Sequence, residues 1–152
     1  MDVPFVEWLK EQIPAGATVL DVGCGDRWYW PRVNAKFIGV DAWEKFKPDY
    51  LLDLEVEDLP QVKVDVVLMS DFLEHMTKDR GLQVLEQAKI LGKVLVLTPL
   101  WWDDNRKSFE DAKGNYYRNE YVLHRSKWSV EDFAGFEQNT VACPGYFLGH
   151  LR

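Results

Sequence analysis

Acidic residues end three apolar segments of the chain, and glycines follow the first of them. Asp21, Asp41 and Asp53 each come directly after a short run of mainly apolar residues. Gly23 and Gly25 come just after Asp21, where the absence of side chains permits a tight turn and a close approach of a ligand to the backbone. A carboxylate accepts hydrogen bonds from the two hydroxyls of a ribose or from an ammonium group. The pattern predicts a site for a ligand that carries such donors.

The spacing of the glycines bears on the kind of nucleotide. The dinucleotide fingerprint requires Gly-x-Gly-x-x-Gly, but the third position here is Trp28, whose bulk opposes close packing of helix on strand. The sequence also lacks the Gly-x-x-x-x-Gly-Lys-Ser/Thr loop that binds a triphosphate. These observations disfavour a nicotinamide-dependent oxidoreductase and favour a nucleoside ligand without phosphates.

The elements that position these residues alternate between strands and helices. Apolar runs predict strands at 17–22, 36–41, 50–53, 64–70 and 93–98. Helical spacing predicts helices at 4–13, 26–33 and 77–91, the second limited by Pro31 and the third with Leu82, Leu85 and Ala88 on one face. Residues 100–128 are polar and aromatic and are predicted to form a long functional loop. A short helix at 129–135, capped by Ser129 and Asp132 with Trp128 packed on Phe133, precedes strand-like pieces at 137–142 and 145–151.

This alternation predicts an α/β fold, a Rossmann-like, doubly wound and mostly parallel sheet of about seven strands with an antiparallel C-terminal strand. In such a sheet the carboxyl ends of the strands line the ligand crevice, which places the three acids together. A length of 152 residues predicts a single domain spanning 1–152.

The composition limits the classes of partner and compartment. A formal charge of −7 argues against nucleic acid or an anionic membrane as the main partner. Cys24 and Cys143 have no neighbouring Cys or His at ligand spacing, so neither a disulfide framework nor a metal site is predicted. No signal peptide and no apolar run of membrane-spanning length is present, and a cytoplasmic location is expected.

The motifs occur in the order seen in a known family. The segment Val19–Gly25 resembles the first motif of class I S-adenosylmethionine-dependent methyltransferases of the type 11/12 group. Segment 38–41 resembles their second-strand motif, and segments 53–60, 65–75 and 94–99 resemble their third-, fourth- and fifth-strand regions. Residues 124–136 resemble the tail of the same group. The resemblance covers roughly residues 17–136.

The resemblance implies roles by position for S-adenosylmethionine, whose product is S-adenosylhomocysteine. The implied cofactor-binding residues are Asp21, Val22, Gly23, Cys24 and Gly25 at the methionine end, Asp41, Ala42 and Trp43 at the ribose, Asp53 and Leu54 at the adenine, and Ser70 again at the methionine end. His75 is the candidate catalytic residue, as a base or an acceptor contact, although a packed histidine at a helix start remains an equal alternative. The segment Arg27–Trp30 departs from the family pattern and has no explanation in the sequence.

The acceptor is the least defined part. Residues 100–128 carry six basic and five acidic side chains, a net charge of +1 against −8 elsewhere, which favours a small neutral or anionic acceptor. Trp101, Trp102, Tyr116 and Tyr117 either line its pocket or cover the core. The predicted function is methyl transfer to a small molecule by a monomer or homodimer. The alternative is a cofactor-binding or scaffold protein of the same fold without catalysis.

Overall fold

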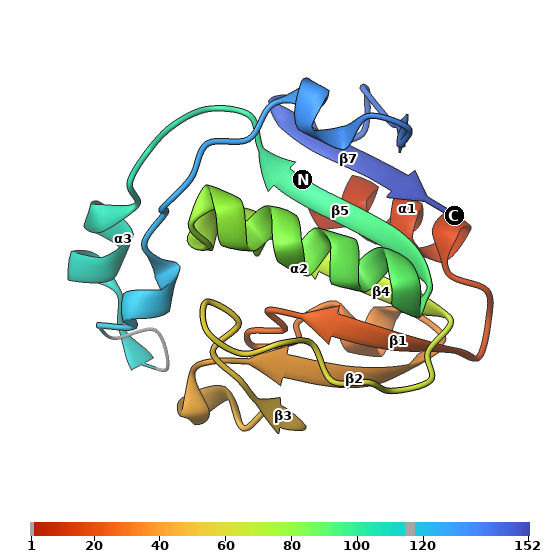
Figure 1. Cartoon of the computed structure of the whole chain (residues 1–152), viewed down its shortest axis with the longest axis horizontal. Coiled ribbons are helices and arrows are strands. Elements are labelled where there is room, and N and C mark those ends of the chain that lie inside the picture. The colour runs from red at the N-terminus through yellow and green to blue at the C-terminus, as the bar shows by residue number, and fades with distance from the viewer. Residues whose placement is uncertain (1, 115–117) are drawn as a thin grey trace.

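The computed structural model describes residues 2–114 and 118–152, which build one seven-stranded sheet (Figure 1). Its strands are β1 (Ala17–Val22), β2 (Ala35–Asp41), β3 (Tyr50–Leu51), β4 (Val66–Ser70), β5 (Lys93–Pro99), β6 (Glu137–Gln138) and β7 (Tyr146–Leu151). The order is β3-β2-β1-β4-β5-β7-β6. β3, β2, β1, β4 and β5 are parallel, whereas β7 is antiparallel to β5 and β6. The predicted fold class, a mostly parallel sheet with an antiparallel C-terminal strand, is confirmed.

Helices cover both faces of this sheet because its strands are apolar on both sides. Leu20 and Val67 pack in the core beneath α2 (Lys78–Leu91), whereas Val19 and Leu68 pack in the core beneath α1 (Asp2–Gln12). Figure 1 shows these two helices on opposite faces of the sheet. Strand residues alternate in this way because successive side chains leave opposite faces. Each fully buried aliphatic side chain contributes roughly 1.5–3 kcal/mol. Leu85 and Ala88, predicted to share one face of α2 with Leu82, are buried, whereas Leu82 is 38% exposed.

The order of strands reverses between β1 and β4. The chain leaves β1 towards β2 and β3 on one side and returns to build β4 and β5 on the other. At such a switch point the connections diverge and leave a crevice at the carboxyl ends of the strands. Gly23 and Ser70 therefore belong to the region of the sheet that is open to a ligand.

The connection from β1 to β2 differs from the predicted helix at 26–33. It contains only a 3₁₀ turn, η1 (Trp30–Arg32). Arg27 has a φ of 60°, in the left-handed region, so the backbone cannot enter a right-handed helix at that residue. Pro31 then follows and removes a backbone donor.

The C-terminal quarter also departs from the prediction. The predicted helix at 129–135 is a 3₁₀ helix, η6 (Val130–Phe133), but its capping box and the packing of Trp128 on Phe133 are as predicted. The predicted strand at 137–142 is only Glu137–Gln138, because the Asn139 side chain accepts hydrogen bonds from the backbone N–H groups of residues 141 and 142 and turns the chain.

The segment 100–128, predicted as a loop, contains helical structure in its described residues. These elements are α3 (Arg106–Asp111) and the 3₁₀ helix η5 (Glu120–Val122). Figure 1 shows α3 beside the carboxyl ends of the parallel strands. Across the described residues, every helix is too short or too polar to cross a membrane.

Candidate functional site

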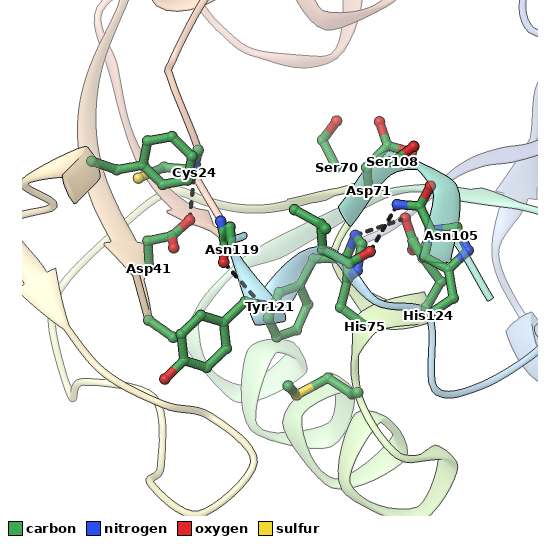
Figure 2. A pocket seen from close by; sticks show the side chains of 18 of the residues that line it. Cys24, Asp41, Ser70, Asp71, His75, Asn105, Ser108, Asn119, Tyr121 and His124 are labelled. Atoms are coloured by element: carbon green, nitrogen blue, oxygen red, sulfur yellow. Dashed lines mark hydrogen bonds and ion pairs between the residues drawn. The ribbon is translucent and has the colours of Figure 1, made fainter. Parts of the chain in front are cut away.

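A cavity of about 850 Å³ opens at the carboxyl ends of the parallel strands. Its walls are the residues that follow β1, β2, β3, β4 and β5, together with parts of the segment 100–128 (Figure 2). This volume lies in the upper part of the range of small-ligand sites, roughly 300–1,000 Å³. The cavity therefore has room for more than one small molecule.

Most of the residues predicted to bind the cofactor line this cavity. They are Gly23, Cys24, Gly25, Asp41, Ala42, Asp53, Leu54 and Ser70. The structure places the other three outside the lining. Val22 is buried within the sheet, and the Trp43 ring meets the Tyr121 ring edge to face at 6.2 Å, with Tyr121 itself in the cavity wall. Asp21 faces two aromatic side chains.

The glycine turn after β1 is held by β2. The N–H groups of Gly23 and Cys24 both donate to the carbonyl of Val40, at 2.8 and 3.0 Å. Gly23 has a φ of 74°, and a Cβ at this residue would lie 2.8 Å from the Phe72 ring. Only glycine meets both requirements, and its small size keeps the backbone open to the cavity.

Asp41 is fixed at the end of β2. One carboxylate oxygen accepts from the N–H of Trp43 at 2.9 Å and the other from the N–H of Gly25 at 2.9 Å. Burial raises the pKa of Asp41, and the backbone donors oppose that effect. Each carboxylate oxygen has two lone pairs, so the anchored group can still accept hydrogen bonds from a pair of hydroxyls.

Asp21 is fully buried and does not line the cavity. Its carboxylate accepts hydrogen bonds from the Tyr29 hydroxyl at 2.7 and 2.8 Å and from Trp30 Nε1 at 2.6 Å. Burial raises the pKa of Asp21 to about 6. The aromatic run after Arg27, unexplained in the sequence, thus contains the hydrogen-bonding partners of this buried acid. Trp30 also stacks on Phe37 of β2 at 4.9 Å.

A second group of polar residues lies where β4 ends, in the 3₁₀ helix η3 (Leu73–His75). The carbonyl of Glu74 accepts from the N–H groups of Arg125 at 2.7 Å and Ser126 at 3.2 Å, and the Ser126 hydroxyl donates to the carbonyl of Leu73. These bonds dock a segment some fifty residues distant onto η3. As a result the His75 and His124 rings lie 4.9 Å apart (Figure 2).

Burial shifts the pKa values of His75 and Glu74 and thereby determines their charge. Burial lowers the pKa of His75 to about 4, with the neighbouring His124 as a second cause, so the ring is neutral at pH 7. Burial, with Asp71 beside it, raises the pKa of Glu74. The lowered pKa makes His75, the predicted catalytic residue, a weak base, but its neutral imidazole carries a lone pair that can bind an electrophile in the cavity.

The aromatic residues of the segment 100–128 have different positions. Trp101 and Trp102 are both about half exposed, but only Trp101 of the two lines the cavity, where it meets Tyr146 edge to face. Tyr116 and Tyr117 lie outside the described residues. Tyr121 and Glu74 also line the cavity but were not predicted as site residues, because neither follows a strand directly and neither belongs to a recognisable spacing pattern.

Comparison with solved structures identifies the fold. A complex of DhpI with SAH is 16% identical, covers 99% of this chain and 83% of that chain, and has a TM-score of 0.68. The small RNA methyltransferase HEN1 is 17% identical with a TM-score of 0.65, and the alignment covers the whole of this chain and 25% of HEN1. A protein assigned to the Zn-dependent alcohol dehydrogenases of Rhodobacter sphaeroides is 14% identical, covers 95% and 87% of the two chains, and has a TM-score of 0.65.

Many of the similar structures are S-adenosylmethionine-dependent methyltransferases. Together with the strand order, they show that this chain has the class I methyltransferase fold. A scan of known family models and a search of curated proteins both find no match. Because identities this low establish the fold alone, the activity has to be argued from the site.

Proposed function

We propose that this chain is an S-adenosylmethionine-dependent methyltransferase, organised as a single domain over residues 1–152, that acts on a small molecule. The observation that carries the proposal is the convergence of the Gly23–Gly25 backbone, Asp41 and Asp53 on one cavity of a class I methyltransferase fold. The cavity offers carboxylates to ribose hydroxyls and an open glycine backbone to the amino-acid end.

The cofactor extends along the edge of the sheet. Its adenine lies by Asp53 and Leu54, its ribose hydroxyls donate to Asp41, and its methionine end lies by the glycine turn and Ser70. The sulfonium is a good leaving group, so the transfer needs little covalent help from the protein. Proximity and in-line orientation of the acceptor supply most of the rate.

The acceptor occupies the remainder of the cavity, between η3 and the described parts of the segment 100–128. Trp101, His75 and His124 line this part. HEN1, which shares the fold, is described as an RNA methyltransferase. The net charge of −7 in this chain favours a small molecule, because nucleic-acid binding relies on neutralising phosphates with basic side chains. The cytoplasmic location and the monomeric or dimeric state stay predictions.

The test is calorimetric titration with S-adenosylmethionine and S-adenosylhomocysteine of the wild type and of Asp41→Asn. The asparagine keeps an oxygen acceptor for the turn but loses the charge that ribose hydroxyls favour. We expect a loss of affinity of at least tenfold, about 1.4 kcal/mol. Glu86→Ala, at an exposed residue of α2, is the matched control and should bind like the wild type.

The outcomes separate the hypotheses. The absence of binding to the wild type at millimolar ligand would reject the proposal. Unchanged affinity in a folded Asp41→Asn variant would reject the assigned ribose site. Tight binding of the cofactor without transfer to any of a panel of small acceptors would instead support the non-catalytic alternative.

A further inference from the structure

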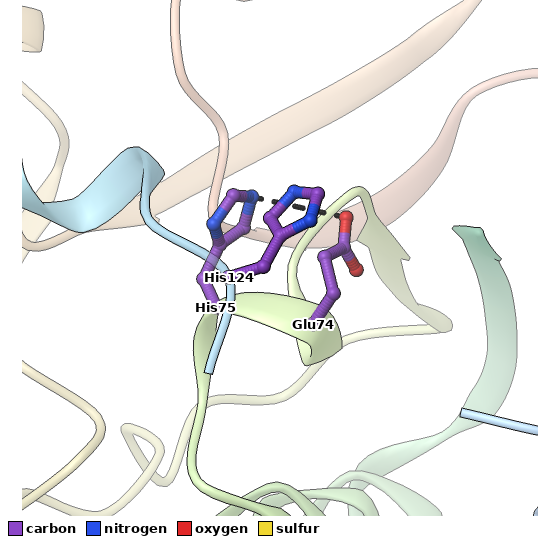
Figure 3. A group of neighbouring side chains, drawn as sticks. All are labelled: Glu74, His75 and His124. Atoms are coloured by element: carbon purple, nitrogen blue, oxygen red, sulfur yellow. Dashed lines mark ion pairs between the residues drawn. The ribbon is translucent and has the colours of Figure 1, made fainter. Parts of the chain in front are cut away.

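Three side chains at the acceptor end of the cavity direct electron-pair donors at one another (Figure 3). Glu74, His75 and His124 each offer one ligand atom, and these atoms all lie within 4.8 Å of one another. They come from η3 and from the segment docked onto it by the Arg125 and Ser126 hydrogen bonds. The sequence predicted no metal site, because about fifty residues separate His124 from the other two.

Both histidines are oriented by backbone carbonyls. His75 Nδ1 lies 3.2 Å from the carbonyl oxygen of Leu123, and His124 Nδ1 lies 2.7 Å from that of Asp103. A carbonyl only accepts, so each Nδ1 carries the proton and each Nε2 carries a lone pair. Histidines that bind metals almost always donate their other ring N–H in this way.

The carboxylate of Glu74 is not a solvated surface acid. The residue is 2% exposed, and one of its oxygens accepts from the Thr98 hydroxyl at 2.8 Å. The other oxygen lies 3.8 Å from His75 Nε2. The carboxyl group of Glu74 donates a hydrogen bond to the Asp71 carboxylate, through a proton that a bound metal ion would displace, and Asp71 has a left-handed φ of 49°. Such backbone strain is concentrated at functional sites.

We propose that Glu74, His75 and His124 bind a divalent transition-metal ion, through a carboxylate oxygen and the two Nε2 atoms. Two imidazoles and a carboxylate with open positions are a ligand set for Zn²⁺, Fe²⁺ or Co²⁺. Two atoms bonded to one ion at about 2.1 Å are at most about 4.2 Å apart. In a tetrahedral site two such atoms lie about 3.4 Å apart, so donors at the outer separation of 4.8 Å have to close by about 1.4 Å when an ion binds, which side-chain rotations supply.

The open positions of this site face the cavity, and this part of the inference rests on the proposed function. An acceptor hydroxyl that coordinates the ion has a lower pKa and loses its proton to water. Its oxygen then forms a bond to the methyl carbon while the carbon–sulfur bond breaks and its electron pair returns to sulfur. The products are a methyl ether and neutral S-adenosylhomocysteine. The inferred acceptor is therefore a hydroxyl compound.

The test is titration of the full chain, freed of metal with a chelator, with Co²⁺ alone, followed by calorimetry and by the visible absorption of the bound ion. We expect one equivalent to bind to the wild type. His75→Asn and His124→Asn each keep an amide donor near the Nδ1 position, and so the bond to the backbone, but lose Nε2. Each should weaken binding at least tenfold. His150→Gln, at a histidine that is paired with Glu137 at 3.1 Å and lies near the amino-terminal end of β5, should bind like the wild type.

Failure of the wild type to bind Co²⁺ stoichiometrically, or undiminished binding in both asparagine variants, would overturn the metal site. Circular dichroism establishes that each variant is folded, and Glu74→Gln, which retains an acceptor for Thr98, is a third arm. Calorimetry with S-adenosylhomocysteine on the same samples separates the two proposals. Retained cofactor binding without Co²⁺ binding rejects the metal site alone, whereas Co²⁺ binding without cofactor binding rejects the methyltransferase alone.

Discussion

Asp21 shows how a single residue can sit in a ligand-binding motif and yet serve the structure. Its carboxylate is buried against Tyr29 and Trp30 instead of facing the cavity. Burial raises its pKa from 3.8 to about 6, so the folded protein holds a proton that the unfolded chain releases. A shift of this size corresponds to roughly 3 kcal/mol of stability lost as the pH rises from about 4 to above 6.

The substitution Asp21→Asn should reduce this pH dependence. The asparagine oxygen can accept from Trp30, and its amide can donate to the Tyr29 oxygen, so the hydrogen bonds are retained. Between pH 5 and 8 the wild type should lose roughly 1–2 kcal/mol more of its free energy of unfolding than the variant. Urea denaturation across this range measures it, with exposed Asp79→Asn as the control for loss of one charge. Parallel pH profiles for wild type and Asp21→Asn would contradict the assignment.

At the scale of elements, the turn after β1 determines the shape of one end of the cavity. Gly16 and Gly23 have nearly equal φ values, 77° and 74°, but different surroundings. A Cβ at Gly16 would meet nothing within 4 Å, whereas a Cβ at Gly23 would lie 2.8 Å from Phe72. The two positions therefore separate the cost of backbone conformation from the cost of crowding.

Alanine at each glycine gives the comparison. Gly16→Ala should cost roughly 1–2 kcal/mol, the penalty of a left-handed conformation. Gly23→Ala should cost roughly 1–3 kcal/mol more because of overpacking, and it should also weaken S-adenosylhomocysteine binding. Urea denaturation and calorimetry measure the two effects. Equal losses of stability in the two variants would contradict the predicted overpacking, because they would show that the turn can move away from Phe72 without a loss of free energy.

Arg80 of α2 anchors the connection from β3 to β4, which has no helix of its own. Its guanidinium donates to the carbonyls of Leu54 at 2.6 Å and Glu57 at 2.5 Å. Arg80→Ala should cost roughly 1–3 kcal/mol, since these carbonyls lose a charged donor. It should also weaken cofactor binding, because Asp53 and Leu54 belong to this wall. Lys89→Ala, which breaks a surface pair with Glu86 on the same helix, should cost at most about 0.5 kcal/mol. A similar loss in both variants would argue against an anchoring role.

For the molecule as a whole, the sheet could be predicted because each strand is marked by its own short stretch of sequence. Buried parallel strands are continuous apolar runs, and Ser129 with Asp132 mark a helix start within four residues. The length and type of short elements could not be predicted, since the left-handed Arg27 and the side-chain turn at Asn139 override the apolar pattern.

The acceptor end depends on contacts between distant parts of the chain. His124 lies beside His75 only because the N–H groups of Arg125 and Ser126 donate hydrogen bonds to the carbonyl of Glu74. No sequence pattern predicts those hydrogen bonds. Likewise, the sequence shows Tyr29 and Trp30 near Asp21, but it does not reveal that they hydrogen-bond to its carboxylate. Local patterns thus predicted most of the cavity wall that follows β1, β2 and β3, whereas the grouping of Glu74 with the two histidines required the tertiary structure.

The packing of Cys24 makes its thiol resistant to alkylation. Its thiol is buried opposite Gly39, where a Cβ would come within 2.8 Å of the sulfur, and the residue is also part of the cavity wall. Burial, reinforced by the nearby Asp21 and Asp41, raises the pKa of this thiol far above its usual range. Only the thiolate is an effective nucleophile. Under the proposed function, the cysteine beside the methyl-donating sulfonium is therefore held in the thiol form, which an alkylating agent does not modify.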